Sequence, residues 1–375
     1  MSFEPRVPYN QLPKLPPKES CETPEVFLAC ISAARKLAEL KQAGESIPNQ
    51  SMLINTIPLL EAQMSSAIEN IVTTTDKLFQ QASLLNSNAD VATKETLRYR
   101  TALNVGFEEA KTRPVTMSTA TKICQILLNV DLNVRKLPGT VIANSKTGKV
   151  IYTPPAGESV IRELLTNWER YLHETRDVDP LIKMAVSHYQ FEAIHPFTDG
   201  NGRTGRILNI LFLIQEGLLN IPILYLSRYF LYTKSDYYKL LNGVTQKNSW
   251  IPWILYVLAG VEETSTWTLE KIRNIRLLLR HTCEFAQKKL PKVYSRELID
   301  ILFTQPYCRI SNVTDAGLVQ RETASLHLRQ LAKIGVVEVT QHGRDKVFCN
   351  KRLLELLQSV DPPPPPPPSA ENLGT

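Results

Sequence analysis

The chain has 375 residues, which is enough for two or three domains with hydrophobic cores of their own. With 43% hydrophobic and 21% charged residues it has the composition of a globular protein, which excludes wholesale disorder. A formal net charge of +6 is mild for this length, so it permits an acidic partner surface without demanding nucleic acid.

The cysteines and the apolar runs indicate the compartment. No CxxC pair and no histidine at zinc-ligand spacing occurs, so we expect reduced, mostly packed thiols. The N-terminus lacks the basic and then apolar profile of a signal peptide. The apolar run that begins with residues 207–214 is too short and too polar to span a bilayer. These features predict a cytoplasmic protein without a membrane partner.

Residues 1–90 are predicted to form an N-terminal, largely helical region. Residues 1–20 are rich in proline and are expected to lie extended along a domain surface or to stay loose. Apolar residues at helical spacing begin near Glu22 and continue to Leu40. Pro48 and Pro58 are expected to interrupt the helices that follow.

Residues 91–285 are predicted to form a helical core that contains one β-hairpin. Helical patterns cover residues 93–109 and 116–133, and they resume from Ser159 to about Gln287. Between them, segment 139–154 has two β-prone arms around a turn of the sequence NSKTG, which favours a hairpin. The apolar arm residues are Val141, Ile142, Val150 and Ile151.

The twelve residues 195–206, HPFTDGNGRTGR, contain most of the chemically active groups. Gly200 and Gly202 allow a turn in which successive N–H groups converge, and the apolar helix that follows adds the positive end of its dipole. Such a turn is typical of a phosphate-binding site. Arg203 and Arg206 are three residues apart, so on a helix both guanidiniums can face the same phosphate chain.

Two further groups in this segment predict the reaction class. Asp199 is suited to Mg²⁺, which prefers few carboxylates together with phosphate oxygens. His195, just before the turn, is placed to accept a proton from an incoming nucleophile. Together with the anion-binding turn, these groups predict phosphoryl or nucleotidyl transfer.

This segment resembles the signature of the Fic family, HPFxDGNGRxGR, and matches it at every specified position. Fic proteins mostly transfer the AMP of ATP to a Ser, Thr or Tyr hydroxyl of another protein. The resemblance therefore implies a protein adenylyltransferase, a nucleotidyltransferase that modifies target proteins and itself. It also implies a mainly α fold: a Fic helical-bundle core with a β-hairpin flap, preceded by an N-terminal helical region and followed by a winged helix.

The resemblance also implies the role of each signature residue. His195 is the general base that deprotonates the target hydroxyl, and Asp199 holds Mg²⁺. The backbone of the turn cradles the α- and β-phosphates, and the two arginines pair with the β- and γ-phosphates. The ATP site implied in this way comprises Glu69, His195, Gly200, Asn201, Gly202, Arg203, Thr204, Gly205 and Arg206.

The hairpin has a general and a family-specific interpretation. An isolated hairpin is usually a solvent-exposed ribbon, whereas Fic proteins carry a flap at this place. Through main-chain bonds from Val141, Ile142, Val150 and Ile151, the flap would add an edge strand to the target segment. Because such pairing is largely blind to sequence, the target stays unidentified.

An upstream pattern resembles an inhibitory element. Ser65 and Glu69 are one helical turn apart on the same face. A solvated surface glutamate is the ordinary explanation, but Ser65, Glu69 and Asn70 match [S/T]xxxE[G/N], and the pattern precedes the signature. This order resembles the Fic class whose inhibitory helix is N-terminal to the core. Glu69 would then pair with Arg206 and turn the α-phosphate of ATP away from in-line attack.

Aromatic residues that follow the signature are candidates for the adenine pocket. In Fic proteins this region lines the base, which implicates Tyr232, Tyr237 or Tyr238. Most such tyrosines are core residues with one polar edge, and the spacing does not choose among the three. His188 has no position in the motif and is expected to be structural.

Residues 290–358 resemble a winged helix, with helices over residues 295–305, 310–316 and 321–334 and a two-stranded wing that turns at Gly343. The second helix of such a module often reads DNA. However, residues 293–358 hold nine Lys and Arg against seven Asp and Glu, which is a weak footprint for DNA, so protein docking is equally well supported. The candidate contacts are Arg321, His327, Arg329 and Lys333. Residues 359–375 form a tail with a polyproline spacer at 362–368.

Three alternatives stay open. The first is a Fic-type transferase of phosphate, UMP or phosphocholine. The second is an enzyme that removes AMP from modified proteins or works in both directions. The third is a winged-helix transcription regulator with a vestigial Fic core. The sequence leaves the oligomeric state open, including a homo-oligomer.

Overall fold

The computed structural model describes residues 3–47, 49–84, 89–143, 147–342 and 345–359. It is mainly helical with two small antiparallel sheets, which confirms the predicted fold class. The tail from residue 360, the centre of the flap turn at 144–146, Gly343 in the wing turn and Pro48 lie outside the described residues. Within the described ranges, no helix has the length and apolar character needed to cross a bilayer.

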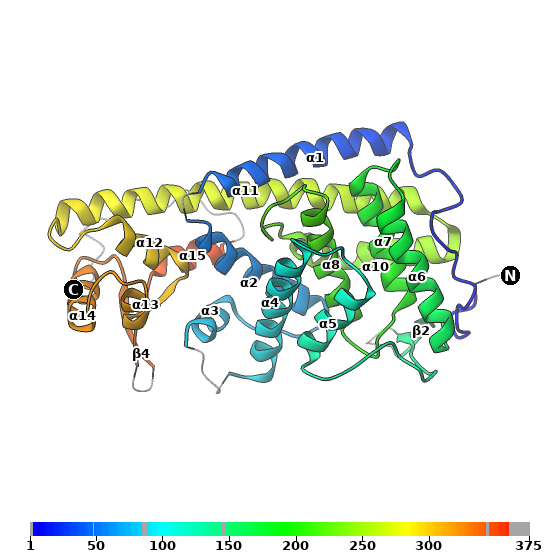
Figure 1. The fold of residues 1–375 in the computed structure, drawn as a ribbon, viewed down its shortest axis with the longest axis horizontal. Coiled ribbons are helices and arrows are strands. Elements are labelled where there is room, and N and C mark those ends of the chain that lie inside the picture. Colours follow the sequence, from blue (N-terminus) through cyan, green and yellow to red (C-terminus); the bar gives the residue numbers. More distant parts are fainter. Residues whose placement is uncertain (1–2, 48, 85–88, 144–146, 343–344, 360–375) are drawn as a thin grey trace.

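Two long helices lie side by side along the molecule. Helix α1 (Pro24–Glu45) lies along α11 (Trp250–Lys289), a single helix of 40 residues that reaches from the core to the C-terminal domain (Figure 1). Thr23 caps α1, and one apolar face of α1 is buried. That face comprises Val26, Cys30, Ala33, Leu37 and Leu40.

Helix α2 (Ser51–Ile68) runs through Pro58 without a break, so the expected interruption there is wrong. A proline inside a helix lacks the N–H for one backbone hydrogen bond, and its ring crowds the carbonyl of the residue four positions earlier. The ring of Pro58 is buried among apolar side chains, and this burial offsets the loss of one hydrogen bond. Helix α3 (Thr75–Leu84) follows α2. The intact α2 carries both Ser65 and, at its C-terminal end, Glu69.

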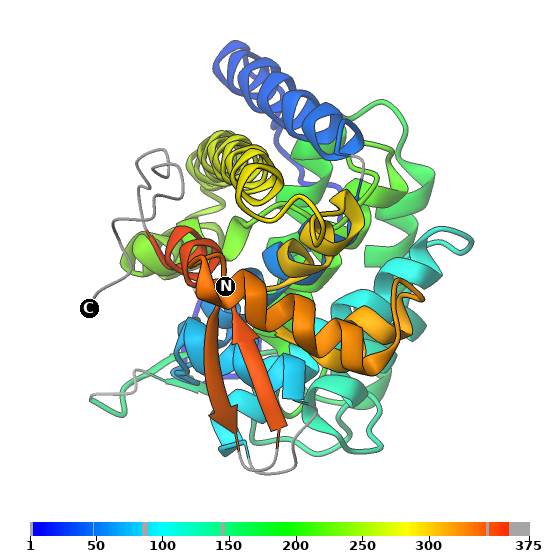
Figure 2. The ribbon, with the colours of Figure 1, turned by 90° about the vertical axis from the view of Figure 1, so that its left-hand side faces the viewer.

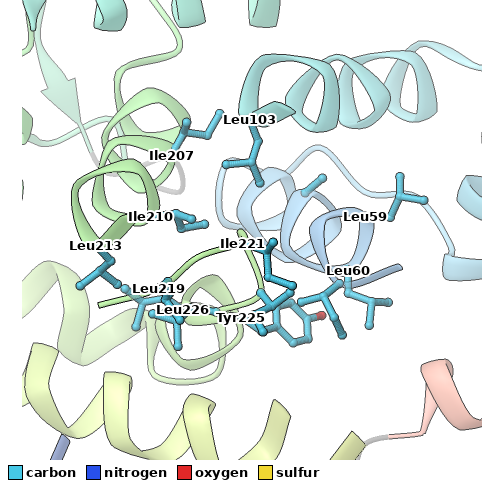
Figure 3. Packing of buried hydrophobic residues seen from close by; sticks show 14 of the residues in the cluster. Leu59, Leu60, Leu103, Ile207, Ile210, Leu213, Leu219, Ile221, Tyr225 and Leu226 are labelled. Carbon is cyan, nitrogen blue, oxygen red and sulfur yellow. The ribbon is translucent and has the colours of Figure 1, made fainter. Parts of the chain in front are cut away.

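The core forms where α2 meets α4 (Val91–Ala110) and α8 (Asn201–Gln215). Helix α5 (Met117–Leu128) ends earlier than expected, because Asn129 adopts the left-handed conformation with φ +56°. Figure 3 shows buried side chains of α2, α4 and α8 together with those of residues 219–226, which follow α8. Among them are Leu59, Leu60, Leu103, Ile207, Ile210, Leu213, Leu219, Ile221, Tyr225 and Leu226.

Among the described residues, four more helices complete the core. They are α6 (Glu158–Glu174), α7 (Pro180–Ile194), α9 (Leu226–Tyr232) and α10 (Lys234–Lys247). The flap is a short antiparallel pair, β1 (Ile142–Ala143) and β2 (Val150–Tyr152), in which Ile142 pairs with Tyr152.

The C-terminal domain contains α12 (Arg296–Thr304), β3 (Tyr307–Arg309), α13 (Ile310–Asp315), α14 (Arg321–Lys333), β4 (Glu338–His342), β5 (Asp345–Cys349) and α15 (Lys351–Gln358). Its strands are ordered β3-β5-β4, and the wing strands project beside α14 in Figure 2. Strand β3 and helix α15 were not predicted.

Two groups of contacts locate this domain and its proposed DNA residues. The hydroxyl of Tyr307 donates to Asp76, and Ser83 Oγ donates to the Tyr307 carbonyl at 3.2 Å, so the domain docks on α3. On α14, three of the candidate DNA contacts are exposed, whereas His327 is half-buried in a cleft that Leu298 also lines. The exposed candidates are Arg321, Arg329 and Lys333.

Candidate functional site

His195 lies at the C-terminal end of α7 in the left-handed region, with φ +50°. Its Nδ1 donates to the carbonyl of Glu192 at 3.3 Å, because a carbonyl oxygen can only accept. This bond leaves Nε2 with its lone pair, ready to accept a proton. Desolvation by the surrounding protein lowers the pKa of His195 to about 4, so the imidazole is neutral at physiological pH.

The turn after His195 opens the N-terminus of α8. Gly200, in the left-handed region at φ +77°, is the N-cap and has no side chain to occupy the first N–H groups. The amide of Asn201 accepts from Phe197 N and donates to Phe197 O, both at 2.9 Å. Asn201 therefore shapes the loop with its side chain and offers only its backbone to a phosphate.

Asp199 lies at the rim of this turn. One carboxylate oxygen accepts from Gly200 N at 2.6 Å, and the side chain is 74% exposed. No group of three or more His, Cys, Asp or Glu side chains close enough to hold a metal occurs among the described residues. A single exposed carboxylate beside a phosphate-binding turn fits Mg²⁺ bound mainly by substrate phosphates and water.

Arg203 is buried on the first turn of α8. Its Nη1 is 3.2 Å from Glu95 Oε2 of α4, and its Nη2 is 4.0 Å from Asp199 Oδ2. Its buried Nε has no hydrogen-bond partner in the described structure. A buried donor without a partner is costly, so a ligand that reaches this nitrogen would gain affinity from it.

Arg206 contacts the end of α2 through three hydrogen bonds. Nη2 is 2.8 Å from Glu69 Oε1 and 3.0 Å from the Ser65 carbonyl, and Nε donates to Ser65 Oγ at 2.8 Å. Burial acts to raise the pKa of Glu69, but the Arg206 guanidinium outweighs it and holds this pKa below its usual value. The pair is therefore ionic at neutral pH.

The end of α2 explains why Asn follows Glu69 in the pattern. Asn70 adopts the left-handed conformation at φ +63°, which Asn and Gly tolerate best. The Ile71 N–H donates to the Ser66 carbonyl and the Asn70 N–H to the Ala67 carbonyl, both at 3.0 Å. These bonds form a Schellman motif, which stops the helix directly after Glu69.

Gly202 lets the Glu69 carboxylate approach α8. A Cβ atom at this position would lie well inside van der Waals distance of Glu69 Oε1 and 3.0 Å from Arg206 Nη1. The Glu69 carboxylate thus lies against the first turn of α8, where the helix dipole favours negative charge. A phosphate group would be drawn to the same position.

Two signature residues assigned to ATP face the interior of the core. The side chain of Thr204 is fully buried. A Cβ atom on Gly205 would lie 2.7 Å from Glu192 Oε1 of α7, so Gly205 permits close packing of α7 against α8. Both residues belong to the start of α8, and their contact with ATP stays a prediction.

The three candidate tyrosines differ in their surroundings. The hydroxyl of Tyr237 is 2.9 Å from His188 Nε2 inside an aromatic cluster, and both side chains are buried. Tyr232 is 58% exposed, and the guanidinium of Arg228 lies 5.0 Å from its ring centroid. Tyr238 is 41% exposed, and burial together with the charge of Glu69 raises its pKa.

Several residues at this site were missed by the sequence reasoning. Glu95 holds Arg203, and Lys234 Nζ donates to the Ile68 carbonyl at the end of α2. Burial raises the pKa of Glu192 to about 7, and its Oε1 has no hydrogen-bond partner in the described structure. None of these residues belongs to a recognisable motif, so only the fold could identify them.

Three family models match consecutive parts of the chain. Residues 27–108 match the model of the Fic/DOC family N-terminal region, and residues 116–213 match that of the Fic/DOC family. Residues 278–353 match the C-terminal domain of protein adenylyltransferase SoFic-like proteins.

Curated relatives match over shorter stretches. The chain is 34% identical over 110 residues to protein adenylyltransferase fic-1 of Caenorhabditis briggsae, which covers 28% of this chain and 20% of the relative. It is 34% identical over 155 residues to protein adenylyltransferase Fic of Drosophila melanogaster, which covers 39% of this chain and 30% of the relative. It is 40% identical over 70 residues to a probable protein adenylyltransferase of Aquifex aeolicus, with 19% and 22% covered. The chain thus spans less than a third of these relatives.

Solved structures support the fold. A Fic family protein from Desulfovibrio desulfuricans G20 superposes with a TM-score of 0.56 at 17% identity, covering 89% of this chain and 98% of that one. A Fic domain containing signaling protein from Bacteroides thetaiotaomicron gives a TM-score of 0.50 at 19% identity, covering 64% and 98%. At these identities the similarity concerns the fold alone.

Proposed function

Because the chain belongs to the Fic/DOC family, we propose that it is a protein adenylyltransferase. It transfers the AMP of ATP to a Ser, Thr or Tyr hydroxyl of target proteins and of itself. One arrangement carries this proposal: a neutral imidazole with a free Nε2 directly precedes the open N-terminus of α8, which is followed by two buried guanidiniums.

In the proposed reaction, His195 Nε2 takes the proton of the target hydroxyl. The hydroxyl oxygen attacks the α-phosphorus of ATP and forms the new P–O bond, while the bond to the β-phosphate oxygen breaks and diphosphate leaves. N–H groups of the first turn of α8 hold the phosphates, and Arg203 adds positive charge. The low pKa of His195 keeps it in the base form.

Asp199 is the proposed protein ligand of Mg²⁺. Its exposed carboxylate at the rim of the turn fits a cation whose remaining ligands are phosphate oxygens and water. When bound, the ion would neutralise charge that develops on the departing phosphates. The guanidinium of Arg203 lies 4.0 Å from this carboxylate, on the same side of the turn.

We further propose that Glu69 inhibits the enzyme. Its carboxylate occupies the Arg206 guanidinium that would otherwise bind the γ-phosphate of ATP, and it lies against the same turn of α8. ATP that enters in this state would bind with its α-phosphate out of line with the target hydroxyl. Release of Glu69 from Arg206 would therefore be the activating step.

The partners implied by this function are ATP and protein targets. A target segment would pair with the flap, where Val141 is 48% exposed and Ile142, Val150 and Ile151 are half-buried. The six cysteines are buried free thiols in the described structure, which supports a reducing compartment such as the cytoplasm.

The same site supports removal of AMP as a second activity. The Glu69 side chain is 35% exposed and bonds Arg206 through Oε1, so we assign its other oxygen to the orientation of an attacking water. Purified AMP-modified chain, incubated with Mg²⁺ and no ATP, would release AMP if this reaction occurs. Loss of that release in Glu69→Gln would assign it to Glu69.

Labelled ATP tests the proposed transfer. Glu69→Gly chain is incubated with Mg²⁺ and ATP labelled on the α-phosphate or, in parallel, on the γ-phosphate. Adenylyl transfer predicts that only the α-label becomes protein-bound. Uptake of the γ-label alone would instead indicate phosphate transfer and contradict the proposal.

A further inference from the structure

Arg135 lies in the segment between α5 and the flap and is only 4% exposed. Its Nε donates to the His195 carbonyl at 2.8 Å, and its Nη2 donates to the Ile194 carbonyl at 3.3 Å and to the Pro155 carbonyl. Its own N–H donates to the Pro196 carbonyl at 2.9 Å. One residue thus bonds the base-bearing turn and the segment that follows the flap.

These bonds stabilise a turn that is otherwise unfavourable. The last carbonyls of α7 have no intrahelical partner, and the helix dipole places negative charge at this end. A guanidinium donates hydrogen bonds to these carbonyls and places a positive charge at the negative end of the dipole. His195 itself adopts a left-handed conformation that non-glycine residues avoid, so external bonds are needed to hold it there.

Tyr152 of β2 makes a parallel connection. Its hydroxyl donates to the Ala193 carbonyl at 2.7 Å, and the side chain is 7% exposed. Because β2 pairs with β1, this bond joins the flap to α7. The carbonyls of Ala193, Ile194 and His195 are therefore all bonded to the flap strand or to Arg135.

The N-terminal segment fixes Tyr152 from the other side. The Tyr9 N–H donates to the Thr153 carbonyl at 3.0 Å, and Thr153 Oγ1 donates to the Pro5 carbonyl at 2.7 Å. The Phe3 ring stacks on Tyr152 with 6.1 Å between centroids. The flap stem is thus enclosed between the N-terminal segment and α7.

We propose that Arg135 is a positioning residue that sets the distance between the target-binding flap and the imidazole of His195. This inference rests on the proposed adenylyl transfer, because it concerns how the target hydroxyl meets the base. Pairing with the flap fixes the target backbone, and Arg135 fixes the base relative to that flap. The phosphate-binding groups of α8 are separate from this connection.

The arrangement predicts which kinetic constants change. Loss of Arg135 should lower turnover and leave ATP affinity near that of the parent, because Arg135 does not contact the α8 turn. The acid limb of the pH profile should also move. Desolvation and the Arg135 charge lower the pKa of His195, whereas the Glu192 backbone, Glu69 and Asp199 raise it. Removing Arg135 should therefore raise the pKa of His195 relative to the parent.

The test uses the full-length Glu69→Gly chain as parent, with α-labelled ATP and a tagged full-length His195→Ala chain as acceptor. Arg135→Met, Arg135→Lys and Tyr152→Phe are compared with Arg170→Met, an exposed arginine of α6 paired with Glu174. We expect Arg135→Met to lower kcat about 10- to 100-fold, as small misplacements of a base do, with an unchanged KM for ATP and a raised acid limb. Arg135→Lys keeps the charge, so its acid limb should stay near that of the parent while its rate falls.

Each outcome is decisive. If the parent transfers no label to the acceptor, adenylyl transfer is contradicted, and this inference with it. If Arg135→Met transfers label as fast as Arg170→Met, only the positioning role of Arg135 is overturned. If Arg135→Met loses ATP affinity and turnover by the same factor, Arg135 stabilises the site in general and does not position the base. If Arg135→Met fails to fold in thermal melting, Arg135→Lys and Tyr152→Phe decide by the same comparison.

Discussion

Glu69 Oε1 lies 2.8 Å from Arg206 Nη2, although 137 positions of the chain separate the two residues. The contact joins the C-cap residue of α2 to the last residue of the signature segment 195–206. Ser65, one turn earlier on α2, bonds the same guanidinium through both its hydroxyl and its carbonyl. The N-terminal region is thus built into the nucleotide site itself, and the following predictions concern that connection.

Glu69→Gln keeps the shape of the side chain and removes its charge. We expect it to weaken the contact with Arg206 and to raise incorporation of α-labelled AMP by roughly 5- to 150-fold, the usual range of coupling between two sites. The ATP affinity should rise together with the rate, because Arg206 becomes available to the γ-phosphate. A variant with the incorporation rate of the unmodified chain would remove Glu69 from the inhibitory role.

Neighbouring serines offer a matched pair. Ser65 Oγ accepts a hydrogen bond from Arg206, whereas the buried Ser66 Oγ has no partner in the described structure. Ser65→Ala should therefore raise AMP incorporation by a smaller factor than Glu69→Gln. Ser66→Ala should leave the rate unchanged and should not lower the melting temperature. Equal rates in the two alanine variants would contradict a specific contribution of Ser65.

Substitutions at Asn70 test how the helix end orients Glu69. Asn70→Gly suits the left-handed conformation and should preserve both stability and inhibition. Asn70→Val should cost about 1–2 kcal/mol of unfolding free energy in urea titrations, because a side chain branched at Cβ opposes this conformation. It should also raise AMP incorporation, since the end of α2 can no longer hold Glu69 in place. Inhibition as strong in Asn70→Val as in Asn70→Gly would show that the Schellman motif is dispensable.

Glu61, two turns before Glu69 on α2, is expected to make the stability of the fold depend on pH. Its carboxyl is buried, accepts from Ser227 N at 3.0 Å, and lies 3.2 Å from the Tyr99 hydroxyl. Burial raises its pKa from 4.5 to about 7, so between these values the folded chain holds a proton that the unfolded chain releases. This contribution to stability is present at low pH and is lost as pH rises through about 7.

Glu61→Gln mimics the protonated carboxyl and does not titrate. The variant should therefore gain stability relative to the unmodified chain as pH rises from 5 to 8, by up to about 3 kcal/mol. Urea titrations of both proteins across this range measure the difference. A difference that stays constant, or that shrinks with rising pH, would mean that Glu61 is ionised in the folded protein throughout.

The sequence predicted the parts of the site that are local. The signature turn needs Gly at a left-handed position and a helix start that binds anions. Both features depend on consecutive residues, so the sequence alone predicts them. The pattern around Glu69 was also recognisable, because Ser65, Glu69 and Asn70 resemble the inhibitory element of the Fic family. In contrast, Arg135 and Glu95 act through contacts formed only when distant segments pack, and no local spacing distinguishes them from surface residues.

In the fold too, local features were predictable and tertiary ones were not. Amphipathic helices such as α1 follow directly from apolar spacing. The prediction failed at Pro58, where burial in the core outweighs the local preference to end the helix, and at β3, whose three residues form a strand only through pairing with β5. Tertiary contacts also explain why the Thr204 side chain is buried and why Gly205 packs closely against α7.

The most direct test of adenylyl transfer is intact-protein mass spectrometry after incubation with ATP and Mg²⁺, on the Glu69→Gly chain and on the same chain with His195→Ala. We expect the first to gain the mass of one or more AMP groups and the second to gain none while still binding ATP. A gain equal to phosphate, or an AMP gain that persists without His195, would contradict the account.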